Sequence, residues 1–227
     1  MTGLETLGVV AVGTVCGVDL VSGPQALLSR PLVAAFLGGL VVGAPLPGLA
    51  VGALLELFAL ETLPVGAARY PDWGPPGAAA GALVGASRAS ASPAGWLAVL
   101  LVAIVVAWFG GWLMHQVRRA NGADLHARHA AVAAGDPAAL RALQRNGLLR
   151  DAARAFILAT FALTAGDYVS VWFTRGWQAP QALARLAIAG ATVGVGLWSA
   201  SRLFGRGRTA WWFAGGLALG TLVAVIR

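Results

Sequence analysis

The sequence contains no lysine, so arginine supplies all sixteen of its strongly basic residues. A nucleotide-binding phosphate loop ends in Lys-Ser or Lys-Thr, and the absence of lysine therefore excludes that kind of site. The single cysteine, Cys16, lies inside an apolar run, which excludes an intramolecular disulfide and a cysteine-based metal cluster. His126 and His129 stand near Asp124, but two scattered histidines on an arginine-rich segment are usually ordinary polar residues. We therefore expect neither a metal nor a cofactor.

Charged residues are also scarce, at 11% of the chain, whereas a soluble domain contains roughly 25%. Hydrophobic residues make up 58%, and apolar runs recur along the whole length. The net charge of +7 would suit a nucleic-acid-binding protein, but the arginines gather between the apolar runs, where membrane proteins hold them on the cytoplasmic side. We predict an all-α, polytopic integral membrane protein with no nucleic-acid partner.

Membrane spans need about 20 mostly apolar residues. The sequence offers such runs at about residues 4–20, 96–114, 155–171, 182–201 and 209–226. No basic region precedes the first run and no clear cleavage site follows it, so we predict a span there and no removable signal peptide.

Three further apolar runs are too short for a full span: residues 31–43, 48–63 and 77–86. Prolines and glycines separate them, and residues 64–76 are predicted to be irregular. Broken helices leave backbone N–H and C=O groups inside the membrane that need water or a polar solute as a partner. Short, interrupted segments of this kind are typical of a transporter binding site. We therefore predict broken or re-entrant helices and the solute-binding part within residues 1–90.

Residues 115–154 form the largest polar stretch, with seven arginines and three aspartates. Asp136-Pro137 predicts a helix start and Asn146-Gly147 a helix stop. We expect an amphipathic segment of two short helices at the membrane surface, on the cytoplasmic side together with residues 202–208. Three further spans in residues 155–227 complete a single membrane domain that covers residues 1–227.

Glu56 lies in the middle of a short apolar run, where a charge costs several kcal/mol unless it faces protein or water. Gly48, Gly52 and Glu56 are spaced by four, so they share one helix face. Small residues at this spacing mark close helix packing, which directs the Glu56 carboxylate into the protein. It either binds solute, which we prefer, or forms a structural ion pair with Arg30 or Arg69.

Three more polar residues are candidates for substrate binding. Asp19 and Gln25 precede the short helix that is expected to begin near Pro31, and the unpaired N–H groups at that helix start could hold hydroxyl groups. Asp72 follows a proline in the Pro/Gly-rich loop, where the alternative is an ordinary solvent-facing turn aspartate.

Two other acids are ambiguous, and one glycine pattern is structural. Glu61 lies near the end of its run, where it could reach the interface, and Asp167 is either a second pore acid or an interfacial residue. Gly77, Gly81 and Gly85 form a GxxxGxxxG face, which predicts close helix packing rather than a ligand loop.

Three motifs occur in a fixed order: Ser-Arg-Pro-Leu-Val at 29–33, Gly-Ala-Leu-Leu-Glu-Leu-Phe-Ala-Leu at 52–60, and Val-Gly-Ala-Ala-Arg-Tyr-Pro-Asp at 65–72. Together they resemble the IIC subunit of the mannose/sorbose-type sugar phosphotransferase system. Its members carry an Arg-Pro-Leu segment, a G-x-x-Leu-Glu-hydrophobic stretch and a Gly-Ala-x-x-x-Pro-Asp loop at about these spacings. The motif part covers residues 17–85, and the rest of the chain matches in layout.

The resemblance implies a permease subunit of a phosphoenolpyruvate-dependent sugar phosphotransferase system in the bacterial cytoplasmic membrane. Such a subunit translocates a sugar and is not itself an enzyme. It works with a second membrane subunit, IID, and with the phosphocarriers IIA and IIB, the last of which phosphorylates the sugar. We also expect an oligomer. Glu56 and Asp72 are the best-matched polar positions, with Arg30 beside the helix start.

The chain departs from the family pattern in two places. Pro24 and Gln25 stand where the family often has acids, and Gly43-Ala44 replaces a common Gly-Asp. These departures leave open an alternative, in which a related permease or assembly subunit has changed its cargo and lost coupled phosphorylation. A membrane enzyme would need acids or histidines that converge on one interface, whereas the acids here are scattered singly.

Overall fold

The structure is a computed structural model that describes residues 1–60, 69–86, 92–204 and 215. In these residues it consists of helices and contains no strand, which confirms the all-α fold class. The helices are α1 (Gly3–Asp19), α2 (Pro31–Val41), α3 (Pro45–Ala59), α4 (Gly74–Ala86), α5 (Pro93–Ala127), α6 (His129–Ala133), α7 (Pro137–Gly176) and α8 (Gln181–Phe204).

Three of these helices are long and apolar enough to cross a membrane: α5, α7 and residues 181–199 of α8. They contain the spans predicted at 96–114, 155–171 and 182–201. The predicted first span corresponds to α1, which is 17 residues long. The span predicted at 209–226 lies outside the described residues.

The prediction of short, broken helices near the N-terminus is confirmed. α2, α3 and α4 have 11, 15 and 13 residues. At a rise of 1.5 Å per residue none of them spans a hydrocarbon core of about 30 Å. The irregular stretch predicted at 64–76 was wrong at its end, because Gly74, Pro75 and Pro76 form the first turn of α4. Proline is tolerated there, since the first N–H groups of a helix have no helical partner.

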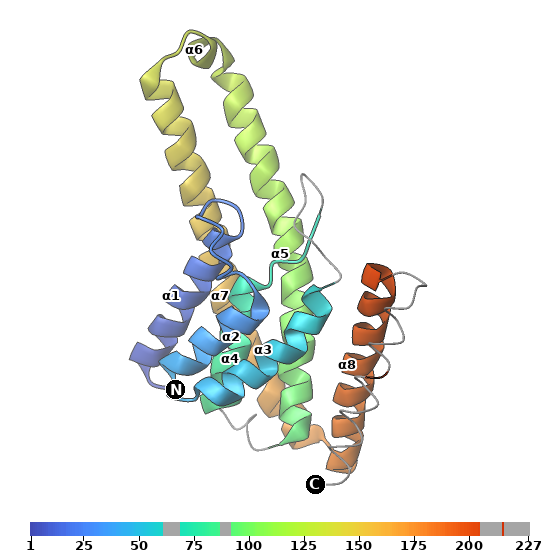
Figure 1. The fold of residues 1–227 in the computed structure, drawn as a ribbon. Helices are drawn as coiled ribbons and strands as arrows, with labels where there is room; N and C mark the ends of the chain where they lie inside the picture. The colour runs from blue at the N-terminus through green and yellow to red at the C-terminus, as the bar shows by residue number, and fades with distance from the viewer. Residues whose placement is uncertain (61–68, 87–91, 205–214, 216–227) are drawn as a thin grey trace.

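Close backbone contacts pack the short helices against one another (Figure 1). A Cβ atom on Gly81 of α4 would overlap the carbonyl oxygen of Ala35, and one on Gly38 of α2 would overlap the carbonyl group of Ala78. The predicted packing role of the GxxxGxxxG face is therefore confirmed. Around this contact, the buried core is shared by α1, α2, α3, α4, α5 and α7.

The arginine-rich stretch 115–154 does not form two separate short helices, so that prediction was wrong. α5 continues as one helix to Ala127, and α7 runs unbroken from Pro137 to Gly176. Their ends form a hairpin, capped by α6, that projects beyond the rest of the bundle (Figure 1). The predicted start at Asp136 is confirmed, because its side chain accepts the Ala138 N–H at 2.9 Å.

The predicted helix stop at Asn146-Gly147 is overridden by contacts across the hairpin. The Asn146 amide donates to Asp124 of α5 at 3.1 Å, and Arg150 donates to Asn121 at 2.9 Å. A glycine inside a helix costs only about 1 kcal/mol relative to alanine, so packing of this kind is enough to carry α7 through Gly147.

Candidate functional site

A cavity of about 310 Å³ lies where the segment between α1 and α2 meets the segment that precedes α4. Its polar lining consists of Asp19, Gln25, Ser29 and Arg30. Its apolar and aromatic lining consists of Leu20, Leu27, Pro31, Tyr70, Pro71 and Trp73. The cavity therefore gathers three of the five candidate residues, Asp19, Gln25 and Arg30. The other two, Glu56 and Asp72, contact or adjoin lining residues without forming part of the lining.

Asp19 organises the segment between α1 and α2. Its side chain is 2% exposed, and both of its carboxylate oxygens accept backbone hydrogen bonds. Oδ1 accepts from Ala26 at 2.8 Å, while Oδ2 accepts from Leu28 at 2.9 Å and from Ser29 at 3.3 Å. A carboxylate at a helix C-terminus is unfavourable with respect to the helix dipole, so these bonds explain why Asp19 can stand there.

The same segment contains two residues in the left-handed region, Gln25 with φ 55° and Leu27 with φ 65°. They flank Ala26, whose N–H group is bound by Asp19. A branched side chain such as leucine seldom adopts this conformation, and such strain collects at ligand sites where the surroundings enforce it. Asp19 therefore holds the segment in a conformation that lets Gln25 and Leu27 line the cavity.

Arg30, immediately before α2, forms an ion pair with Glu56 of α3. The second carboxylate oxygen of Glu56 accepts the Leu32 N–H at 3.1 Å. This N–H is in the first turn of α2, where it has no helical partner. The two helices approach closely because Gly52, one turn before Glu56, lies against α2: a Cβ there would be 2.9 Å from the Pro31 carbonyl oxygen.

Glu56 therefore points into the protein, and its ion-pair partner is Arg30 rather than the exposed Arg69. The Arg30 side chain is 26% exposed and the Glu56 side chain is 21% exposed, so the pair lies at the edge of the buried region. Of this pair, Arg30 lines the cavity. Glu56 is not part of the lining, and it holds the Arg30 guanidinium in place by accepting its hydrogen bond.

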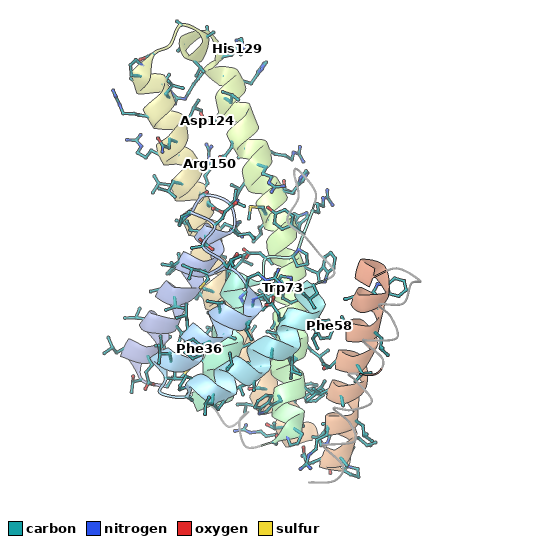
Figure 2. The ribbon with its side chains drawn as sticks, viewed as in Figure 1. Phe36, Phe58, Trp73, Asp124, His129 and Arg150 are labelled. Atoms are coloured by element: carbon teal, nitrogen blue, oxygen red, sulfur yellow. The ribbon has the colours of Figure 1, made fainter. Side chains whose placement is uncertain are left out.

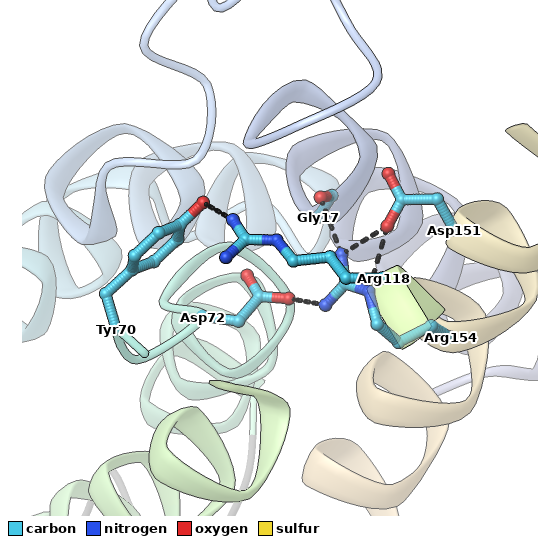
Figure 3. A network of polar contacts seen from close by, with 6 residues as sticks. All are labelled: Gly17, Tyr70, Asp72, Arg118, Asp151 and Arg154. Carbon is cyan, nitrogen blue, oxygen red and sulfur yellow. Dashed lines mark hydrogen bonds and ion pairs between the residues drawn. The ribbon is translucent and has the colours of Figure 1, made fainter. Parts of the chain in front are cut away.

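Asp72 is completely buried, which contradicts the alternative of a solvent-facing turn aspartate. Figure 3 shows its ion pair with Arg154 of α7, which also binds Asp151 at 2.8 Å and donates to the carbonyl oxygen of Gly17 at 3.0 Å. The Asp72 backbone N–H donates to Ala107 of α5 at 2.9 Å. Asp72 therefore joins the segment before α4 directly to α5 and α7, and Arg154 extends the network to α1.

Arg154 and Asp151 were missed from the sequence because they belong to the polar stretch that we assigned to the membrane surface. Both are buried in the structure, with Arg154 3% and Asp151 1% exposed. The usable signal was their spacing of three on the last turn before an apolar run, which places an acid and a base on one helix face. A buried guanidinium of this kind must be paired, since desolvation of an isolated charge is very costly.

The side chain of Tyr70 is held by Arg118 of α5. The guanidinium donates to the tyrosine oxygen at 2.7 Å, and its central carbon lies 5.2 Å from the ring centroid (Figure 3). α5 makes room for the segment with Gly111, where a Cβ atom would overlap the Tyr70 carbonyl oxygen. Residues 70–73 are non-helical but are tied to α5 and to α7 by these contacts.

The two ambiguous acids do not join this cavity. Glu61 lies outside the described residues. Asp167 is exposed and lines a separate hollow of about 580 Å³ together with Thr6 and Arg175. Its position on α7 is about 20 Å from that of Arg154, at 1.5 Å per residue. Within the described residues no group of three or more histidine, cysteine, aspartate or glutamate side chains could hold a metal ion.

Comparison with known proteins gives a consistent result over the whole chain. The family model of the sorbose-specific IIC component of the phosphotransferase system matches residues 4–222. A solved structure described as a membrane protein has a TM-score of 0.72 and 26% identity, covering 100% of this chain and 94% of its own. A chain of the mannose transporter ManYZ, solved in complex with microcin E492, has a TM-score of 0.62 and 25% identity, covering 100% and 95%. No curated protein matches the chain.

Proposed function

This chain belongs to the sorbose-specific IIC family of the sugar phosphotransferase system and is a membrane permease subunit, and from that premise we propose that the cavity beside Arg30 is its sugar site. The observation that carries the proposal is the lining, which combines hydrogen-bonding side chains with aromatic ones inside the part of the chain that has broken helices. The volume of about 310 Å³ is at the lower end of the range for small-molecule sites and suits a monosaccharide.

The polar side chains match the chemistry of a sugar. Hydroxyl groups both donate and accept hydrogen bonds, and a site must offer both kinds of partner. The Arg30 guanidinium donates only, whereas the Gln25 amide and the Ser29 hydroxyl can do both. We assign direct contacts with the sugar to Arg30 and Gln25.

The three carboxylates act mainly through other groups in this proposal. Glu56 orients Arg30, Asp19 holds the segment that carries Gln25, and Asp72 anchors the segment that carries Tyr70. All of these residues lie within residues 1–90, where the broken helices are. The proposal thus keeps every candidate residue in the site but gives the acids supporting roles.

The proposal also includes partners and a location. We infer a IID membrane subunit, the phosphocarriers IIA and IIB, and the bacterial cytoplasmic membrane, with the phosphoryl transfer on the partners and not on this chain. One relative of known structure is a chain of the mannose transporter ManYZ, which supports a sugar-transport setting. Large apolar side chains on the outside of α5, among them Trp108 and Trp112, are 55% and 47% exposed and would face lipid or a partner.

A related permease with a changed cargo and no coupled phosphorylation is the alternative. The observation that favours it is Gln25, which lines the cavity at a position where the family often has an acid. An amide in place of a carboxylate replaces one hydrogen-bond acceptor by a donor. The cavity would therefore bind a sugar with a different arrangement of hydroxyl groups.

Replacement of Gln25 by glycine tests the site directly. Glycine accepts the positive φ of this position without strain and removes the amide, so the fold should persist. We expect the affinity for the transported sugar, with sorbose and mannose as the first probes, to fall about fivefold to tenfold, the loss of one or two hydrogen bonds. Titration calorimetry on the purified chain measures it, with Gln144→Ala on the projecting hairpin as the control. Unchanged affinity in Gln25→Gly would contradict the site.

A further inference from the structure

The cavity has an aromatic wall that the polar candidates leave unexplained. Tyr70 and Trp73 both line it, and both come from the short segment before α4. Trp73 is 7% exposed and lies in the interior of the bundle, away from the projecting hairpin that carries Asp124 and Arg150 (Figure 2). Its ring is thus placed where a solute in the cavity would meet it.

The indole Nε1–H of Trp73 is buried and has no hydrogen-bond partner among the described residues. A buried tryptophan N–H usually finds an acceptor, because leaving a polar group unpaired away from water is unfavourable. The backbone of Trp73 is used in the ordinary way, since its carbonyl oxygen accepts the Gly77 N–H at 2.9 Å. Only the side-chain donor is left over, in a residue that lines the cavity.

The residues around Trp73 are tied to the neighbouring helices. Asp72, its neighbour in sequence, is tied to Arg154 and to the backbone of Ala107. Tyr70 is tied to Arg118. Two arginines from the two longest helices therefore immobilise a segment of four residues whose aromatic side chains line the cavity.

We propose that Trp73 is a sugar-binding residue, whose ring packs against a C–H face of the sugar and whose indole N–H donates to a sugar oxygen. The inference rests on the proposed function and deepens it. A monosaccharide has apolar C–H faces and polar hydroxyl edges, and this cavity offers partners for both, since Tyr70 and Trp73 supply ring surface and Arg30 and Gln25 supply hydrogen bonds. A small anion has no apolar face and would leave the aromatic wall unused. The ligand class is therefore a neutral monosaccharide.

Trp73→Phe keeps an aromatic ring and removes only the N–H donor. We expect the affinity for sorbose or mannose, whichever the wild-type chain binds, to fall about fivefold to tenfold in titration calorimetry. The melting temperature should stay the same or rise, because the variant loses an unsatisfied buried donor. A merely structural tryptophan would show the opposite split, with a lower melting temperature and unchanged affinity. Trp96→Phe, at a half-buried tryptophan lining the groove between α5 and α8, is the matched control and should change neither quantity.

A second measurement uses the wild-type chain and does not depend on the folding of a variant. With ¹⁵N-tryptophan labelling, the indole N–H signal of Trp73 should move on sugar saturation, in the direction of a new hydrogen bond, while the signal of Trp96 stays in place. If the wild-type chain binds neither sugar, the proposed function fails and this inference fails with it. If wild type binds and Gln25→Gly binds weakly, but Trp73→Phe binds normally and the Trp73 signal does not move, the inference alone is overturned.

Discussion

At the scale of single residues, Glu56 and Arg30 show how a charge is kept among apolar helices. The carboxylate receives the guanidinium of Arg30 and the N–H of Leu32, so both of its oxygens are satisfied. The arginine in turn is held at the wall of the cavity. Under the proposed function, Glu56 would contribute to binding through the position of Arg30. Because the pair is partly exposed, we expect its contribution to stability to be modest.

Glu56→Gln separates these two contributions. The amide oxygen can still accept one hydrogen bond, but the charge that orients Arg30 is lost. We expect the affinity for sugar to fall at least tenfold. The free energy of unfolding should fall by about 1 kcal/mol or less, as for a partly exposed ion pair, which lowers the melting temperature by about 2–4 °C at this size. A melting curve and a binding titration on the same sample decide the matter. A large loss of stability, with normal binding by the protein that remains folded, would show a purely structural role.

The sequence was sufficient to select Asp19, Gln25 and Arg30, because polar residues next to a helix start in an apolar context are visible without a structure. It was not sufficient to find Arg154, which is separated from its partner Asp72 by a long stretch of chain and stands in a segment with many other arginines. Nor could it identify Trp73 as a lining residue, since a tryptophan beside a Pro/Gly loop is an equally good interfacial anchor. The partner of Arg154 and the position of Trp73 both depend on tertiary contacts, which only the structure shows.

At the scale of elements, the hairpin of α5 and α7 follows from helix length. A helix of 40 residues, such as α7, measures about 60 Å, whereas the hydrocarbon core of a bilayer is about 30 Å thick. Asp124 of α5 connects the two projecting ends, because Arg150 of α7 approaches it to 3.2 Å and Asn146 of α7 donates to it at 3.1 Å. A polar composition is compatible with a surface helix and with a projecting one, so the sequence alone could not distinguish them; the contacts across the hairpin do.

The orientation of the hairpin is an independent prediction. Its exposed arginines, including Arg141 and Arg145, should hold it on the cytoplasmic side. In a Cys16→Ser background, Ala133→Cys at the tip should resist an impermeant thiol reagent added to intact cells and should react in inside-out vesicles. Ready labelling in intact cells would reverse the orientation.

At the scale of the whole molecule, the surface of the described chain is incomplete without a membrane or a partner. The apolar window of α8 is only 11% buried, although it is apolar enough to cross a bilayer. The segment between α1 and α2, which lines the cavity, lies near the base of the hairpin (Figure 1), on the side where we expect the phosphocarriers.

Protection of the cavity by sugar tests the central claim most directly. Ser29 lines the cavity, so Ser29→Cys in a Cys16→Ser background places a small reactive group there. We expect saturating sugar to slow the reaction of this variant with N-ethylmaleimide severalfold, and to leave the rate unchanged for Ala133→Cys on the hairpin. Equal rates with and without sugar for Ser29→Cys, in a sample shown by titration to be saturated, would place the sugar elsewhere and contradict the account.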